Sequence, residues 1–206
     1  MKKFSLITLL MSLSINAQVR KKGEIEVSPF IGYSTANYYG DVGVLNEAVE
    51  NPYFGINGDF YLNNRWSIRT GIEYQSMGSK GLTFFYLLEY FEEELNFVSL
   101  PIHANYHFGK KRNIYLNFGP TLTYGISYKT DDGSVNINDI RDRFYGGLGV
   151  GYKYPINETF SLAVDYQNFT RIPEFIDYGN ETHYYFHGNS ALNIKAIIYL
   201  GSKKEN

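Results

Sequence analysis

The sequence predicts an all-β protein, an eight-stranded antiparallel up-and-down transmembrane β-barrel with an N-terminal signal peptide. Stretches of about ten residues that alternate apolar and polar side chains run from Gly23 to Gly201. Short and long connections join these stretches in turn. A period of two indicates strands. A sheet that is apolar on one face, with short turns at one end and long loops at the other, is typical of a transmembrane barrel.

Residues 1–17 predict a secretory signal peptide. Lys2 and Lys3 precede an apolar run of about ten residues, and the small Ala17 closes it. Such a run is too short for a membrane helix, which needs about 20 apolar residues. We therefore expect an exported mature chain, residues 18–206, that forms a single outer-membrane β-barrel domain.

Eight alternating runs are the expected strands, and an even number fits a bacterial barrel. The clearest run spans residues 114–128, where Ile114, Leu116 and Phe118 share one face and Asn117 lies on the other. No later segment offers the roughly 20 apolar residues of a membrane helix, so a spanning chain must form a closed sheet. The expected strands are residues 23–33, 52–62, 65–77, 95–108, 113–128, 143–154, 159–170 and 190–201.

The connections between the expected strands fall into two classes. The short ones carry Asn, Gly and Pro, which favour tight turns. The strict alternation predicts that both chain ends and the short turns lie in the periplasm, with the long connections outside the cell. The short connections are residues 63–64, 109–113 and 155–158, and the long ones are residues 34–51, 78–94, 129–142 and 171–189.

One face of the predicted sheet is free of charge and is expected to contact outer-membrane lipid. A Lys or Arg that faces lipid at mid-depth costs about 2 to 4 kcal/mol, so its absence is informative. Tyr, of which the chain has 20, favours the lipid–water interface. The face holds Trp66, Ile68, Ile72, Tyr74, Val98, Leu100, Ile102, Tyr106, Leu148, Val150, Tyr152, Phe160, Leu162, Val164, Tyr166, Leu192, Ile194, Ile198 and Leu200.

The opposite face carries both signs of charge and predicts a polar network inside the barrel. Eight strands enclose a bore that side chains can fill. Gly147, Gly149 and Gly151 leave room for bulky neighbours, so we expect a plugged interior. A narrow channel or small-ligand-binding, porin-like protein is the alternative. The network consists of Glu26, Asp59, Arg69, Glu73, Lys153, Asp165 and Lys195, with His103 and His107 on the same face.

The second long connection is unusually apolar for a solvated loop. An exposed apolar patch usually marks an interaction site, and another envelope protein would be its partner. Packing of these side chains on neighbouring loops, with the third and fourth strands extended above the bilayer, is the other interpretation. The candidate partner surface is Phe84, Phe85, Tyr86, Leu87, Tyr90 and Phe91.

The sequence predicts no metal site, cofactor or catalytic residue. On a strand, residues four apart such as His103 and His107 are separated by about 13 Å, too far for one ion to bridge. His183 and His187 are expected in an aromatic loop rim, and the oxygen-rich segment 131–139 lacks the order of a calcium loop. The absence of Cys excludes a disulfide-stapled scaffold, and the net charge of −2 argues against a nucleic-acid partner.

Several segments resemble the PorT-like outer-membrane β-barrel proteins of Bacteroidetes. The proline-containing segment 96–109 resembles their fourth strand, and segments 68–74, 117–120, 147–152 and 165–166 are also similar. The resemblance covers nearly the whole mature chain. It implies an eight-stranded barrel in the outer membrane and, by analogy with the founding member, a component of the type IX secretion machinery.

These observations predict a non-enzymatic outer-membrane barrel with a structural or accessory role in the cell envelope. Its rigid wall would display the long loops to a partner. No Ser–His pair has the spacing of a lipid A deacylase, which argues against a lipid hydrolase.

Overall fold

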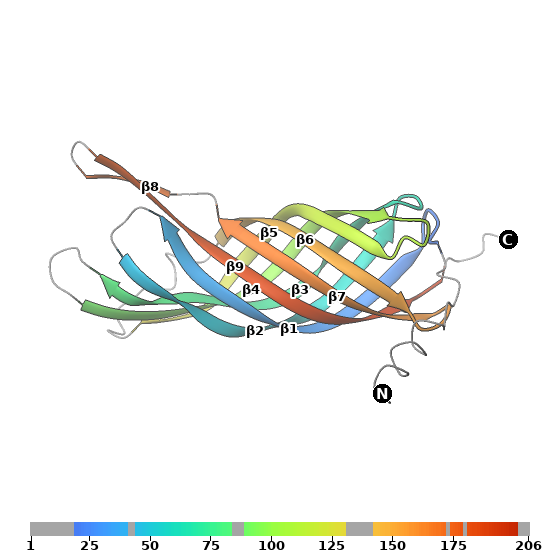
Figure 1. Cartoon of the computed structure of the whole chain (residues 1–206), viewed down its shortest axis with the longest axis horizontal. Helices are drawn as coiled ribbons and strands as arrows, with labels where there is room; N and C mark the ends of the chain where they lie inside the picture. Colours follow the sequence, from blue (N-terminus) through green and yellow to red (C-terminus); the bar gives the residue numbers. More distant parts are fainter. Residues whose placement is uncertain are drawn as a thin grey trace, which may run out of the picture.

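The computed structural model describes residues 19–40, 44–83, 89–130, 142–171, 174–178 and 181–201. Within these ranges all regular structure is antiparallel β-sheet (Figure 1). None of the described segments is a helix long and apolar enough to cross a membrane. The strands are β1 (Ile25–Gly40), β2 (Val44–Tyr61), β3 (Trp66–Thr83), β4 (Glu89–Phe108), β5 (Ile114–Thr130), β6 (Asp142–Pro155), β7 (Phe160–Arg171), β8 (Glu174–Tyr178) and β9 (Glu181–Tyr199).

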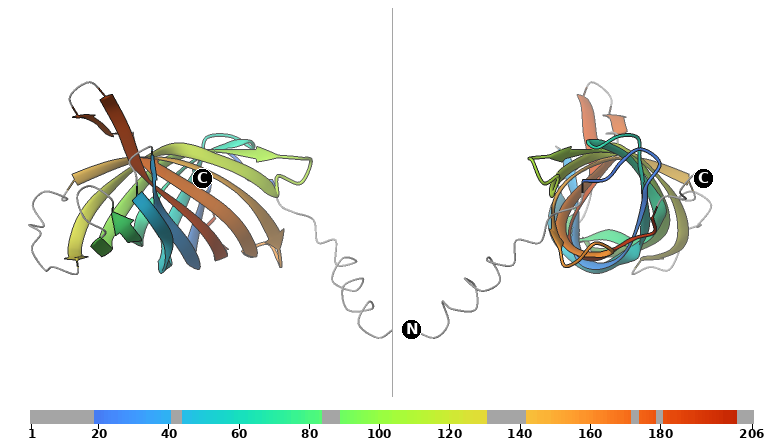
Figure 2. Two further views of the ribbon diagram at one scale, coloured as in Figure 1. Left: turned by 60° about the vertical axis from the view of Figure 1, so that its left-hand side comes forward. Right: turned by 90° about the vertical axis from the view of Figure 1, so that its right-hand side faces the viewer.

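Eight of these strands close into a barrel, which confirms the predicted fold class. Strands β1 to β7 pair in sequence order, β7 pairs with β9, and β9 pairs with β1. The closing pair runs from Glu26 opposite Tyr199 to Gly40 opposite Tyr185. Figure 2 shows the resulting ring of strands from its end. Closure matters because an open sheet edge would leave backbone groups unpaired in lipid.

One end of the barrel, here the turn end, holds short connections and the described residues nearest the two chain termini. The links at residues 62–65, 109–113 and 156–159 are tight, as predicted. Each side chain of Asn63 and Asn157 accepts backbone N–H groups within its own turn. Asn side chains stabilise turns in this way.

The opposite end, here the extended end, contains more strand than the eight predicted runs. The long connections are largely strand: β1 and β2 pair as far as Ala36 opposite Val49, and β3 and β4 as far as Thr83 opposite Glu89. Strand β8, which pairs with the start of β9, lies where residues 171–189 were predicted to be a loop. These strands project past the closed ring (Figure 1). The buried residues there include polar ones such as Ser34, Asn51 and Ser79, so the apolar–polar alternation that marks a strand in sequence is lost while the backbone pairing continues.

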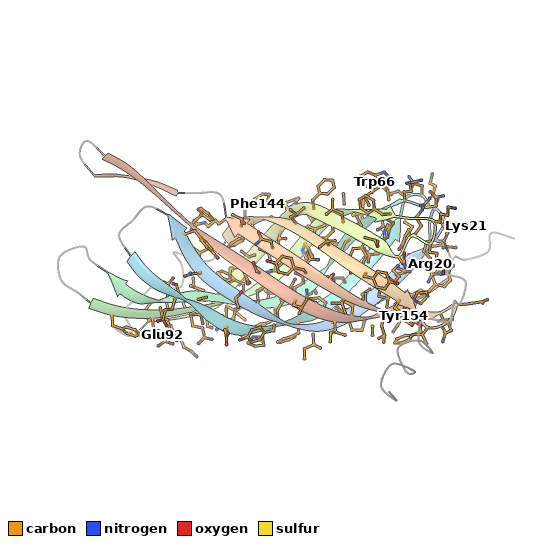
Figure 3. All side chains as sticks on the ribbon, in the orientation of Figure 1. Arg20, Lys21, Trp66, Glu92, Phe144 and Tyr154 are labelled. Carbon is orange, nitrogen blue, oxygen red and sulfur yellow. The ribbon has the colours of Figure 1, made fainter. Side chains whose placement is uncertain are left out.

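The two faces of the wall separate as predicted. Outward residues such as Ile72, Val164 and Ile194 are 50 to 62% exposed, whereas inward residues such as Asp165 and Lys195 are at most 2% exposed. Figure 3 shows side chains covering the outside of the barrel along its length. Figure 3 places the aromatic residues Trp66 and Tyr154 toward the turn end and Phe144 farther along the barrel.

Candidate functional site

The barrel interior is the candidate functional site, and it is filled by three successive layers of side chains. Strand β2 contributes Tyr61, Asp59 and Tyr53 in that order from the turn end, and β7 contributes Asp165 and then Phe169. All five side chains are nearly inaccessible to solvent. The order along the strands gives a turn-end cluster, a central cluster and an aromatic layer.

The turn-end cluster is built around the carboxylate of Glu26. Glu26 accepts a hydrogen bond from the Arg20 guanidinium at 2.8 Å and from the Lys153 ammonium at 2.5 Å. The Tyr61 hydroxyl donates to the same carboxylate at 2.9 Å and accepts from Lys153 at 3.0 Å. Arg20 also lies 3.9 Å over the ring of Tyr199. The cluster ties the chain before β1 to the strands β2, β6 and β9.

The central cluster joins two carboxylates to two cations. Arg69 makes a two-pronged contact with Asp59, at 3.2 and 3.1 Å, and approaches Asp165 at 3.5 Å. Lys195 lies 2.7 Å from Asp165, and the Tyr115 hydroxyl donates to Asp165 at 2.8 Å. Side-chain amides complete the cluster: Asn193 and Gln167 donate to Asp165, and Asn105 donates to Asp59.

Glu73 links the central cluster to the aromatic layer. The Tyr53 hydroxyl donates to its carboxylate at 2.5 Å. The Tyr53 ring in turn packs edge-to-face against Phe30 and Phe169, with centroids 5.0 and 5.8 Å away. The buried members of this layer are Phe30, Ala36, Tyr53, Met77, Leu95, Phe97, Tyr145, Phe169 and Ala191.

The seven predicted interior residues are therefore all buried inside the barrel, and the structure adds an eighth charge, Arg20. Together they are four cations and four acids, so the described interior carries no net formal charge. Pairing of this kind is required because an isolated buried charge is strongly unfavourable. The charged residues are Arg20, Glu26, Asp59, Arg69, Glu73, Lys153, Asp165 and Lys195.

The glycines of β6 provide the space that these side chains occupy. A methyl group on Gly151 would lie 2.3 Å from Tyr115, and one on Gly149 would lie 2.3 Å from Gln167. A methyl group on Gly147 would lie 2.6 Å from the ring of His103. Contacts this short would force the neighbouring side chain to move. Tyr115, Gln167 and His103 can therefore take their present positions because these three residues of β6 are glycines.

The predicted histidine sites take different positions. His103 and His107 are buried inside the barrel, where the His103 ring hydrogen-bonds the Thr121 hydroxyl and the His107 ring hydrogen-bonds the Ser67 hydroxyl. His183 and His187 lie in β9 and not in a loop, and His187 is only 3% exposed. Among the described residues no group of three His, Asp or Glu side chains could hold a metal ion.

The candidate partner surface lies at the extended end. Phe84, Phe85, Tyr86 and Leu87 fall outside the described residues, as does the segment 131–139. Tyr90 is in β4 and is 57% exposed. Phe91 is also in β4, opposite Gly81 of β3. The extension of β3 and β4 beyond the ring was one of the two interpretations of this segment.

Sequence reasoning missed Arg20 and did not name Tyr61 or Tyr53 as partners of the carboxylates. The alternation of β2 places both tyrosines on the inner face, so their position could have been predicted. Arg20 precedes β1 in a segment with no periodicity, so no pattern reveals that it enters the barrel.

Two solved structures share this fold. The outer membrane protein OprG from Pseudomonas aeruginosa has a TM-score of 0.54 and 13% identity, over 92% of this chain and 100% of OprG. The outer membrane protein AlkL, solved in DMPC lipid bilayers, has a TM-score of 0.52 and 14% identity, over 90% of this chain and 94% of AlkL. At such identities the likeness concerns the fold alone.

Sequence comparison identifies the family. No curated protein matches the chain, and the resemblance to PorT-like proteins stays a prediction. The sequence model described as "Outer membrane protein beta-barrel domain" matches residues 5–191, most of the chain. With the closed eight-stranded ring, this match shows that the protein belongs to the family of outer membrane protein beta-barrel domains.

Proposed function

We propose that this outer-membrane barrel is a non-enzymatic accessory protein that presents the extended end to another component of the cell envelope. The observation that carries the proposal is the contrast between the two parts of the molecule. The ring is filled by paired charges and aromatic rings, whereas β1 to β4 and the β8–β9 pair continue beyond it. A filled ring suits an anchor, and a projecting sheet suits a contact surface.

The extended end has features that suit a protein contact. Tyr39 and Tyr90 are 51 and 57% exposed, and the ring of Tyr39 stacks on Phe186 at 5.6 Å. Exposed aromatic residues are enriched in binding interfaces. Near the end of this sheet, the exposed acids Glu47 and Glu92 both lie opposite Lys80 of β3, so the partner surface is expected to be apolar with a charged rim of both signs.

Site-specific photo-crosslinking in cells tests the proposal. A photo-reactive residue at Tyr90 is expected to capture a defined envelope protein. The same residue at Tyr152, which is 49% exposed on the lipid-facing wall near the turn end, is the control. Replacement of Phe84, Phe85 and Phe91 by Ser should abolish capture at Tyr90. Capture that is equal at both sites, or that survives the triple replacement, would refute the partner role.

The narrow channel remains the second candidate because ionised side chains line the central part of the interior. Planar-bilayer recording separates the two functions. Silence supports the filled anchor, whereas a steady conductance that Arg69→Ala retunes would support a channel. The aromatic layer beyond Glu73 favours silence, since it fills the ring with apolar groups.

The resemblance to PorT-like proteins suggests a more specific role in type IX secretion. If the barrel serves that machinery, deletion of its gene should block export of the secreted proteins. Normal export in the deletion strain would dismiss this role and leave the accessory function open.

A further inference from the structure

The mouth of the barrel at the turn end contains a small pocket that is rich in cations. It lies where the chain before β1, the β4–β5 turn and the start of β7 come together, and its volume is about 20 Å³. Four cationic side chains and one acid line it: Arg20, Lys111, Arg112, Lys153 and Glu26. Figure 3 places Arg20 and Lys21 at this end of the barrel.

Glu26 does not neutralise the positive charge of the pocket. Glu26 already bonds Arg20, Lys153 and the Tyr61 hydroxyl, so its carboxylate has little capacity left. Four positive charges against one negative charge leave an excess of three. The mouth therefore differs from the interior as a whole, where cations and acids balance.

Lys111 and Arg112, the two cations from the β4–β5 turn, add positive charge that no nearby acid among the described residues offsets. Arg112 donates to the backbone carbonyls of Gly109 and Asn64, which are neutral. Lys111 is exposed, and no acidic partner for its ammonium is found in the described part of the chain. Both ammonium and guanidinium groups bind phosphate, the first as a point charge and the second through paired N–H groups.

The fold holds these groups close to one another. The backbone N–H of Lys153 donates to the Asn113 carbonyl at 2.7 Å, which fastens the β4–β5 turn beside β6. Arg112 has a left-handed backbone, with φ of 55°, and its side chain bridges this turn to the β2–β3 turn. A mouth with an excess of positive charge, backed by a low-dielectric wall, concentrates the field on an incoming anion.

We propose that this mouth is a binding site for a phosphate group. The pocket holds about one water molecule, so the oxygens of the phosphate enter between Lys111, Arg112 and Lys153 while the rest of the ligand stays outside. A phosphate that carries one or two negative charges offsets most of the excess of three. The phosphate comes either from the solution or from a lipid headgroup, because the turn end lies beside the aromatic residues of the membrane interface.

Isothermal titration calorimetry on the full mature barrel in neutral detergent micelles tests this site. One titration uses inorganic phosphate and a second uses dihexanoyl phosphatidylglycerol, both at constant ionic strength set with sodium chloride. The variant is Lys111→Gln, and the matched control is Lys110→Gln, a neighbour in the same turn that does not line the pocket. Both lysines are exposed, so both variants are expected to fold like the wild type.

We expect saturable binding of at least one probe, with a Kd that Lys111→Gln raises about tenfold, or about 1.4 kcal/mol. Lys110→Gln should change the Kd less than twofold. Binding of inorganic phosphate would identify a soluble ligand, and binding of the lipid alone would identify a headgroup. Absence of heat with both probes, no effect of Lys111→Gln, or equal loss in the two variants would overturn the proposal. The site stands apart from the proposed partner contact, which lies at the opposite end.

Discussion

The Asp165→Asn substitution is expected to destabilise the barrel more than most single changes. The Asp165 carboxylate receives Lys195 at 2.7 Å and the Tyr115 hydroxyl at 2.8 Å, and Arg69 lies 3.5 Å away. Asparagine has nearly the same size and keeps one acceptor, so the substitution mainly removes the charge. Lys195, which is 2% exposed, would then be a buried cation without its partner. Breaking a buried pair in this way costs about 3 to 5 kcal/mol of unfolding free energy.

A second substitution tests whether the unpaired charge is the cause. In the double variant Asp165→Asn with Lys195→Met, Arg69 still pairs with Asp59 and no cation is left alone. Replacing a whole buried pair by uncharged groups is often nearly neutral, so we expect the double variant within about 2 kcal/mol of the wild type. The double variant should therefore be more stable than Asp165→Asn alone.

Urea unfolding in lipid vesicles measures these free energies, with the fluorescence of Trp66, the only Trp in the chain, as the signal. The matched control is Lys80→Met, because the Lys80–Glu47 pair at 3.8 Å is exposed at the extended end. An exposed pair contributes less than about 1 kcal/mol. The reasoning would be refuted if Asp165→Asn stayed within about 1 kcal/mol of the wild type, or if the double variant were the less stable of the two.

Three further predictions concern packing and the lipid face. Gly151→Ala should lower the unfolding free energy by about 1 to 3 kcal/mol, because its methyl group would lie 2.3 Å from Tyr115; the loss is measured by urea unfolding. Ile72→Arg should lower it by about 2 to 4 kcal/mol in the same assay, because Ile72 faces lipid and is 62% exposed. The fluorescence of Trp66 should be quenched more by lipids brominated near the headgroup than by lipids brominated near the chain ends, because Trp favours the interface.

Controls for these predictions come from the same strands. Gly146→Ala should be silent, since its methyl group would approach only the Thr170 carbonyl, at 3.8 Å. Ile72→Leu keeps the apolar surface and should leave the unfolding free energy nearly unchanged. If Gly146→Ala and Gly151→Ala were equally destabilising, the loss would reflect backbone effects and not contact with Tyr115. Equal quenching at all bromine depths would contradict an interfacial Trp66.

The part of the fold inside the membrane could be predicted because lipid and interior impose opposite demands on neighbouring residues. Ile194 must face lipid and Lys195 must avoid it, so the order of the two fixes the orientation of β9. The same logic places Asp165 between Val164 and Tyr166. Burial of the predicted interior residues follows directly from this alternation, although the identity of each partner does not.

The extended end and the turn-end cluster were less predictable, for physical reasons. Ser34 of β1 is paired with Asn51 of β2, but neither residue is apolar, so a sequence pattern shows a loop. The position of β8 depends on pairing with β9 and leaves no alternation to detect. Arg20 is held by Glu26, six residues further on, and by Tyr199 of the last strand, which comes next to it only when the barrel has closed.

The seam between β1 and β9 has a kinetic consequence. The backbone N–H of Leu200 donates to the Ile25 carbonyl at 3.1 Å, so the ring joins the first and last strands of the domain. Contacts between residues so distant in sequence form slowly. Before β9 pairs with β1 and β7, the incomplete sheet has two open edges. The unpaired backbone N–H and C=O groups at these edges find no hydrogen-bond partner in lipid. Insertion is therefore expected to await synthesis of nearly the entire polypeptide, and a truncation that removes β9 should yield material that fails to integrate.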